Sequence, residues 1–343
     1  MHSIFLNGHS FMSTDQSGIL ISVSSVYQNV NEIKGSSWYD HKIYHPQWVS
    51  PERYFLLKKV GRGKYSTVFK ALQDKKRDVA IKILVPLDPK RYLREIKILN
   101  NLSNGPNIVK LYDLVQDPAT GIYSYVFEWV EFQDWRVLYQ SFTIDDIRFY
   151  MHELLVALDY SHSNGIMHRD IKPQNIAIDK SKKKLRLLDW GLADFYHPRQ
   201  KYSSHVATRI FKPPELLINY PYYDYSLDIW SAGLTFSIMM FRQIIFASGE
   251  NDSQQLIKVA EVVGGKKILQ YAQDLKMTLD SSTVENLRQC PGTGLSKIIH
   301  DTDPELCPPD AYDLLLQMMV VDHRKRITAE DALKHPFFAP LRK

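Results

Sequence analysis

Carboxylate and amide side chains occur at a chemically suggestive spacing in the middle of the chain. In the segment His168–Asn175, the carboxylate of Asp170 could accept a proton from a hydroxyl group. Asn175 follows five positions later, and Asp189 lies fourteen positions beyond it, at the start of the triplet Asp-Trp-Gly. Carboxylate and amide oxygens suit Mg²⁺ bound to a nucleotide. The pattern therefore predicts phosphoryl transfer from a nucleotide.

A glycine-containing turn and a lysine lie upstream of these residues. The turn Gly61–Ser66 lies between two strand-like runs, where glycines let the backbone approach a phosphate. This signal is weak alone, because hairpin turns have similar sequences. A dinucleotide-binding fold would need a helix to begin there, whereas Thr67–Lys70 has a strand pattern. Lys82 ends an apolar strand, and Glu95 on a predicted helix is a suitable partner for its charge.

The elements that must position these residues fall into two regions. From Tyr54 to Tyr125, β-rich runs recur, and one amphipathic helical pattern at Arg91–Asn100 interrupts them. Residues 1–35 are polar and show no sustained period, so we expect a partly disordered extension. We predict an α+β fold with a small antiparallel β-sheet lobe and one main helix over residues 36–131. A large, mainly helical lobe is predicted over residues 132–343.

Composition excludes several classes of protein. The chain has 343 residues, of which 44% are apolar and 12% aromatic, and its net charge is +5. These values exclude a disordered tail and a collagen-like fibre. Cys290 and Cys307 are the only cysteines, so no disulfide framework is expected. No apolar stretch is long enough to span a bilayer, and residues 1–10 lack a secretory pattern, so we expect an intracellular protein.

Positive charge is concentrated in two segments. Residues 180–212 contain nine Lys and Arg against Asp189 and Asp194, and residues 75–97 contain eight against three acidic residues. On charge alone, a solvated surface and a site for nucleic acid, an acidic protein or a phosphopeptide remain open alternatives. A nucleic-acid surface is disfavoured because the aromatic residues of these segments do not alternate with the cations as a base-stacking platform would require, and an acidic substrate already accounts for the charge.

Taken together, these motifs resemble the protein kinase family. GRGKYS, VAIK, Glu95, HRDIKPQN, DWG and PPE match its glycine-rich loop, β3 lysine, helix glutamate, catalytic loop, metal-binding triplet and activation-segment end. The chain resembles the catalytic α subunits of casein kinase 2 more closely than it resembles protein kinases in general. Ser66 replaces a third glycine, Trp190 replaces a phenylalanine, and FYHP follows at residues 195–198. The likeness covers roughly residues 26–338 and implies the bilobal protein kinase fold.

The resemblance implies a role for each matched residue. Lys82, braced by Glu95, would hold the α- and β-phosphates, and Asp170 would orient the acceptor hydroxyl group. Lys172 would steady the γ-phosphoryl group, while Asn175 and Asp189 would bind Mg²⁺. The implied nucleotide is ATP, with GTP as an alternative. Besides Lys82 and Glu95, the implied nucleotide-binding residues are Gly61, Arg62, Gly63, Lys64, Tyr65, Ser66, Val68, Ala80, Phe127, Glu128, Val130, Ile176 and Leu188.

The resemblance also implies a substrate class. Lys172 two residues after Asp170 is the serine/threonine form of the catalytic loop, and the family selects targets that are followed by acidic residues. Several family cations are missing here, and a histidine replaces one arginine of the activation segment, so we expect weaker acidic recognition. The residues expected to contact an acidic substrate are Arg91, Arg94, His205, Arg209 and Lys212.

Regulation and partners follow from the same likeness. We expect activity without phosphorylation of Ser203, Ser204 or Thr208 in the activation segment, which runs from Asp189 to Glu215. We also expect a regulatory β-subunit dimer in an α2β2 assembly, a location in the cytoplasm and nucleus, and no membrane or direct nucleic-acid role. Some of Leu56, Phe69, Ile81 and Ile83, in neighbouring strands, are expected to face away from the helix and contact the β subunit. The alternative is that all four fill the core of the small lobe.

Two other functions are considered beside this one. TRIFKPPE, at residues 208–215, also resembles the cyclin-dependent group, so a proline- or arginine-directed kinase is one alternative. A catalytically inactive scaffold is the other. It would require Lys82, Asp170 or Asp189 to be missing, and all three are present.

Overall fold

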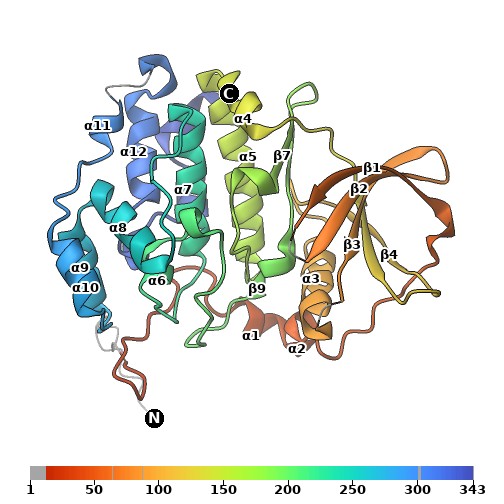
Figure 1. Cartoon of the computed structure of the whole chain (residues 1–343), viewed down its shortest axis with the longest axis horizontal. Coiled ribbons are helices and arrows are strands. Elements are labelled where there is room, and N and C mark those ends of the chain that lie inside the picture. Colours follow the sequence, from red (N-terminus) through yellow and green to blue (C-terminus); the bar gives the residue numbers. More distant parts are fainter. Residues whose placement is uncertain (1–12, 64, 87, 300–302, 343) are drawn as a thin grey trace, which may run out of the picture.

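The chain folds into two lobes of different composition (Figure 1). The computed structural model describes residues 13–63, 65–86, 88–299 and 303–342. The small lobe is a five-stranded antiparallel sheet in the order β1-β2-β3-β5-β4, with helix α3 beside it, and the large lobe is mainly helical. The predicted α+β bilobal fold is confirmed.

The small lobe positions Lys82 and Glu95 through one sheet and one helix. Val68 of β2 pairs with Lys82 of β3, and Lys82 forms an ion pair with Glu95 of α3, so this face of the sheet faces the helix. Its elements are β1 (Tyr54–Arg62), β2 (Ser66–Gln73), β3 (Arg77–Leu84), α3 (Pro89–Asn101), β4 (Leu111–Gln116) and β5 (Tyr123–Glu128). By the same register and alternation, the residues on the opposite face are Leu56, Phe69, Ile81 and Ile83.

The large lobe is built around two long helices, and residues 129–134 connect it to β5. Helix α7 is buried along nearly its whole length, which explains why its sequence is apolar on all sides. No helix in the described part of the chain is long and apolar enough to cross a membrane. The helices are α4 (Trp135–Gln140), α5 (Ile144–Ser163), α6 (Pro214–Leu217), α7 (Ser226–Phe241), α8 (Asp252–Val263), α9 (Gly265–Asp274), α10 (Ser281–Arg288), α11 (Ser296–Ile299), α12 (Pro309–Met318) and α13 (Ala329–Leu333).

Short strands of the large lobe present the catalytic segments to the cleft between the lobes. β6 pairs with β9, and β7 pairs with β8, so residues 168–175 and 188–193 are held at the ends of two small antiparallel sheets. The strands are β6 (Ile166–Met167), β7 (Ile176–Asp179), β8 (Lys184–Leu187) and β9 (Asp194–Phe195).

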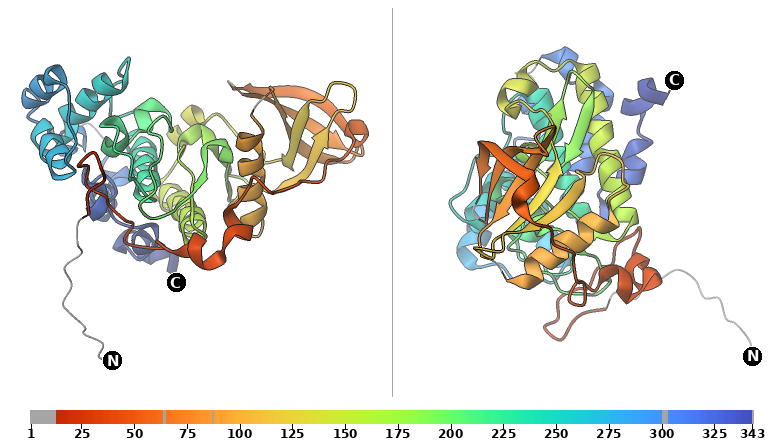
Figure 2. Two further views of the ribbon diagram at one scale, coloured as in Figure 1. Left: turned by 90° about the horizontal axis from the view of Figure 1, so that it is seen from below. Right: turned by 90° about the vertical axis from the view of Figure 1, so that its right-hand side faces the viewer.

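Residues 13–40, here called the N-terminal strap, make defined contacts with the large lobe. The strap runs along the large lobe to the base of α3 and contains α1 (Val30–Lys34) and α2 (Ser36–Tyr39) (Figure 2). Asn31 Nδ2 donates to the backbone oxygens of Gly165 and Tyr196 at 2.7 and 2.8 Å. Residues 13–35 thus make defined contacts with the large lobe, and bonds of this kind leave no apolar periodicity in the sequence. Residues 1–12 lie outside the described residues.

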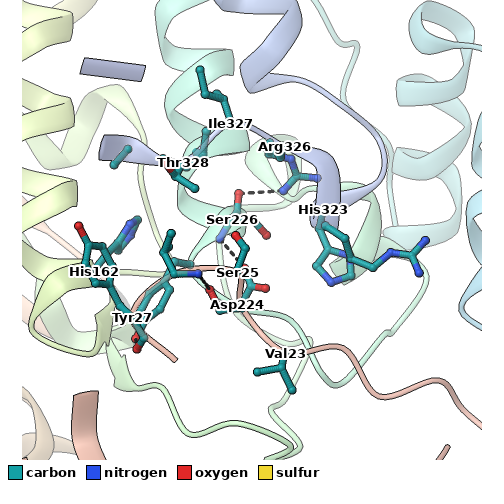
Figure 3. Close-up of a pocket in the computed structure, with 16 residues that line it drawn as sticks. Val23, Ser25, Tyr27, His162, Asp224, Ser226, His323, Arg326, Ile327 and Thr328 are labelled. Carbon is teal, nitrogen blue, oxygen red and sulfur yellow. Dashed lines mark hydrogen bonds between the residues drawn. The ribbon is translucent and has the colours of Figure 1, made fainter. Parts of the chain in front are cut away.

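The strap also closes a small cavity at the beginning of α7 (Figure 3). Val23 and Tyr27 of the strap line it, opposite residues of α5 and the segment around His323. Its volume is about 50 Å³, whereas ligand sites usually occupy roughly 300 Å³ or more. Ser22 Oγ lies 2.9 Å from His323 Nε2 at its edge. These contacts indicate an anchoring role for the strap rather than a second ligand site.

Candidate active site

Lys82 joins three elements that face the cleft. Its Nζ atom lies 2.7 Å from Glu95 Oε1 on α3 and 2.9 Å from Asp189 Oδ1. Burial disfavours the charged ammonium group, but the two carboxylates outweigh this effect and raise the pKa of Lys82. Attraction to Lys82 lowers the pKa of Asp189 to about 2. Lys82 and Asp189 are therefore charged at neutral pH. Burial raises the pKa of Glu95 although Lys82 opposes this shift, and the contact between the two side chains holds α3 toward the cleft.

The Asp189 triplet is fixed by the residues around it. Asp189 has a left-handed backbone conformation, with φ of 54°. Trp190 is buried, and its Nε1 donates to the backbone oxygen of Leu187 at 3.3 Å, so the indole both fills the core and binds the loop. His168 Nε2 lies 2.9 Å from the Leu188 oxygen, which links the triplet to the catalytic loop.

A buried carboxylate holds the start of the catalytic loop. Asp228 of α7 accepts hydrogen bonds at 2.8 Å from the backbone N–H groups of His168 and Arg169. Burial would raise the pKa of Asp228, but hydrogen bonding to His162 and these contacts hold it below its ordinary value. Arg169 has φ of 66°, an unusual conformation for a non-glycine residue, which the Asp228 contacts stabilise.

Asp170 is the centre of a hydrogen-bonded group. Its Oδ2 atom accepts from Lys172 Nζ at 2.7 Å and from Asn175 Nδ2 at 3.1 Å. Its Oδ1 atom accepts from both the backbone N–H and the hydroxyl group of Thr208, each at 3.0 Å. Lys172 Nζ also donates to Thr208 Oγ1 at 2.8 Å. These bonds fix the orientation of a carboxylate that could receive a hydroxyl proton.

The donor set near Asp170 fits a divalent metal carried by a nucleotide. Asn175 uses its Nδ2 atom to bond to Asp170, so its amide oxygen can serve as a ligand. The Asp189 side chain is 51% exposed and contacts Lys82 through one oxygen, so its carboxylate is also accessible. No group of three or more His, Cys, Asp and Glu side chains within the described ranges could hold a metal. Phosphate and water oxygens must therefore complete the coordination.

The glycine-rich turn forms the tip of the β1–β2 hairpin. Gly61 pairs with Val68, and the Gly63 N–H donates to the Ser66 oxygen at 2.8 Å, so this amide closes the hairpin turn. A side chain at Gly61 would meet nothing within 4 Å, which leaves space for close approach of a ligand to the backbone. Arg62, Tyr65 and Ser66 belong to the same hairpin, and Lys64 lies outside the described residues.

The apolar residues expected around the base come from both lobes. Ala80 pairs with Phe127 on the Lys82 face of the sheet, and Val68 lies on the same face. Ile176 begins β7 in the large lobe, and the N–H of Leu188 donates to the Asn175 oxygen at 2.8 Å. The structure thus places these side chains on the small-lobe sheet and on the loops that carry Asn175 and Asp189.

Glu128 and Val130 occupy the connection between the lobes. The Glu128 carboxylate is 6% exposed and lies 2.6 Å from Lys184 Nζ and 2.7 Å from Arg186 Nε of β8. Burial opposes its ionisation, but these two cations lower the pKa of Glu128. The Glu128 side chain is therefore paired within the chain, and the predicted nucleotide contact at this connection stays a prediction. Val130 is buried just beyond β5.

The five predicted substrate cations differ in accessibility. Arg91 and His205 are exposed, and the Arg209 side chain is 47% exposed. Arg94 instead forms an ion pair with Asp194, and Lys212 forms one with Asp252. Arg94 and Lys212 are thus paired inside the protein, and the substrate contacts of all five cations stay predictions.

The prediction of site residues missed two contacts. Thr208 was considered only as a phosphorylation site, yet its hydroxyl group contacts both Asp170 and Lys172. Asp194 was counted only as an acidic residue, yet it lies 2.8 Å from Arg169 and 3.1 Å from Arg94. Each of these two residues lies within a few positions of a recognised motif, and this proximity could have marked it as a candidate site residue. The partners themselves lie 25 to 100 positions away, and no local pattern identifies them.

The comparison with known protein families agrees with this geometry. The protein kinase domain matches residues 54–338, which includes the sheet, α3, the catalytic loop and the activation segment. This range covers most of the chain and contains all the residues described above except the strap. The chain belongs to the protein kinase family, whose domain transfers a phosphoryl group from ATP with the help of a divalent metal ion.

Proposed function

We propose that the chain is a serine/threonine protein kinase that prefers targets followed by acidic residues, as the casein kinase 2 catalytic subunits do. The observation that carries the serine/threonine assignment is the contact of Lys172 Nζ with both Asp170 and Thr208. Together these three residues border the position of an acceptor hydroxyl group. Mg²⁺ is the proposed metal, and ATP, with GTP as an alternative, is the proposed donor.

The chain's own residues account for the transfer step. Lys82 binds the phosphates of the donor and stays charged because Glu95 and Asp189 surround it. Asp170 orients the acceptor hydroxyl group and receives its proton, while Lys172 stabilises charge on the transferred group. A divalent metal held by Asn175 and Asp189 would neutralise phosphate charge.

The preference for acidic targets rests on exposed cations near the acceptor site. Arg91 on α3 lies beside Tyr65 of the glycine-rich hairpin, with its guanidinium carbon 5.5 Å from the ring centre. Arg209 is half-exposed one residue after Thr208, which contacts Asp170. Both cations therefore lie close to the site of transfer. Many other cations of the basic segment 180–212 are paired internally, so this segment needs no nucleic acid to balance its charge.

Activity without phosphorylation is also part of the proposal. In kinases that need activation, the arginine of the catalytic loop binds a phosphate in the activation segment. Here the Asp194 carboxylate lies between Arg169 and Arg94, and Arg169 Nε also donates to the Leu192 oxygen at 2.7 Å. A carboxylate of the chain thus supplies the negative charge that a phosphate would otherwise bring.

The strap supports the same state of the activation segment. Tyr39 packs against His197 with ring centres 4.6 Å apart, and Asn101 Nδ2 of α3 donates to the Trp38 oxygen at 2.8 Å. The strap therefore connects α3 to the activation segment.

By analogy with casein kinase 2, we propose that the protein is located in the cytoplasm and nucleus.

The exposed side of the small sheet is the proposed docking surface for a β-subunit dimer. Leu56, Phe69, Ile81 and Ile83 share the face opposite α3. Leu56 is 50% exposed, whereas Ile81 is buried in the core of the small lobe with Ile83 packed against it. An apolar edge of this kind is typical of a protein contact.

Lys82→Met and Asp170→Ala should each lower phosphoryl transfer by about a hundredfold or more, because both residues act on charge that develops during transfer. The rate can be measured with radiolabelled ATP and a serine peptide followed by acidic residues. Lys59→Met, at an exposed position of β1, is the control and should retain activity. Near-normal transfer by a folded Lys82 or Asp170 variant would contradict the assigned roles.

A serine peptide followed by acidic residues should be used about tenfold more efficiently than one followed by proline. Two or three exposed cations at about 0.5 kcal/mol each account for this difference. The Michaelis constant of the acidic peptide should rise between about 0.05 and 0.3 M salt, because exposed charges are screened in that range. Equal use of both peptides, or preference for proline, would favour the proline-directed alternative.

A purified casein kinase 2 β-subunit dimer should bind the chain at micromolar concentration, as measured by sedimentation velocity. Leu56→Glu should weaken the complex strongly, because it places a charge in an apolar contact. Leu316→Glu on α12 is the matched control, since Leu316 is also exposed but lies in the other lobe. If the unaltered chain sediments alone, or if both variants bind equally, this surface is not the docking site.

A further inference from the structure

Asp252 occupies the side of the activation segment that carries two of the predicted substrate cations. It is the first residue of α8, and its Oδ2 atom lies 2.6 Å from Lys212 Nζ. Its Oδ1 atom lies 3.7 Å from Arg209 Nε. The dipole of α8, a helix of 12 residues, also favours a negative charge at its N-terminus. The Asp252 carboxylate therefore lies beside both cations.

The two cations differ in how far Asp252 neutralises them. The Lys212 side chain is 7% exposed, and its Nζ atom also donates to the Ser204 oxygen at 3.2 Å. The Arg209 side chain is 47% exposed, its Nε atom lies 3.7 Å from Asp252 Oδ1, and its Nη1 atom donates to the Gly249 oxygen at 3.2 Å. An incoming carboxylate thus meets one accessible guanidinium group, one buried ammonium group and one carboxylate that repels it.

We propose that Asp252 limits the specificity of this kinase for acidic substrates, by acting as an internal carboxylate that occupies the cation pair Arg209 and Lys212. This inference rests on the proposed function. At this site Arg209 alone would contact the acidic substrate, because Lys212 is neutralised by its ion pair with Asp252. Replacing Asp252 with a neutral residue of the same size should make both cations available.

A purely structural role for the Lys212–Asp252 pair gives a different expectation. The pair connects the activation segment to α8, and an unpaired buried ammonium group is unfavourable. If that were its only role, Asp252→Asn would loosen the segment and impair acidic and neutral substrates alike. The ratio of the two efficiencies separates this reading from the proposal.

The test compares two serine peptides, one followed by acidic residues and one by the corresponding amides, on the full chain. Asp252→Asn should raise the acidic-to-neutral ratio of kcat/KM about three- to tenfold, through a lower KM for the acidic peptide. Glu250→Gln is the matched control. Glu250 is exposed two residues earlier and forms no ion pair among the described residues, so its variant should keep the original ratio.

Two further measurements test the proposal even if the Asp252→Asn variant folds poorly and has low activity. Arg209→Gln in the otherwise unchanged chain should remove most of the acidic preference that this site provides, although Lys212 is still present. Fluorescence anisotropy of a labelled acidic peptide should show tighter binding to Asp252→Asn, and this gain should disappear in the double variant Lys212→Met, Asp252→Asn. Neither readout depends on a full level of catalysis by the Asp252 variant.

The outcomes distinguish the two proposals. If the unaltered chain phosphorylates the acidic peptide but Asp252→Asn leaves the ratio and the anisotropy unchanged, the role of Asp252 is refuted and the proposed function stands. An unchanged preference in Arg209→Gln also refutes it. If the unaltered chain phosphorylates neither serine peptide, the proposed function fails, and the inference about Asp252 fails with it.

Discussion

The contact of Lys82 with Glu95 and Asp189 is the interaction on which the active site depends. It joins the sheet, helix α3 and the Asp189 triplet through one ammonium group, at 2.7 and 2.9 Å. A charge buried to this extent is stable only while both carboxylates remain in place. The structure therefore has to hold α3 and the activation segment in position, and much of the chain outside the cleft serves this purpose.

Three groups of contacts hold these parts. Asp228 fixes the backbone of the catalytic loop, and Asp194 links Arg169 of that loop to Arg94 of α3. The strap adds a connection from outside, through Trp38 and Asn31. All of these contacts lie within the chain itself, so the arrangement requires neither a phosphate nor a partner to neutralise the two arginines.

Sequence motifs predicted the residues of the cleft better than the contacts that support them. Lys82, Asp170 and Asp189 could be recognised because their spacing along the chain reflects a local arrangement of loop and strand. The Lys212–Asp252 pair joins residues 40 positions apart, and no local pattern reveals that a predicted substrate cation is already neutralised. The contacts of the strap could not be predicted, because side-chain bonds to backbone oxygens, such as those of Asn31, leave no periodic signal.

The central claim is that this chain assembles an active site without phosphorylation, and one measurement tests it directly. The protein would be made in bacteria, treated with phosphatase and shown by mass spectrometry to carry no phosphate, before transfer to an acidic serine peptide is measured. We predict an unchanged rate after treatment, and a loss of about tenfold or more in Asp194→Asn, which leaves Arg169 and Arg94 without their shared carboxylate. An enzyme that is inactive until Ser203, Ser204 or Thr208 is phosphorylated would contradict the account.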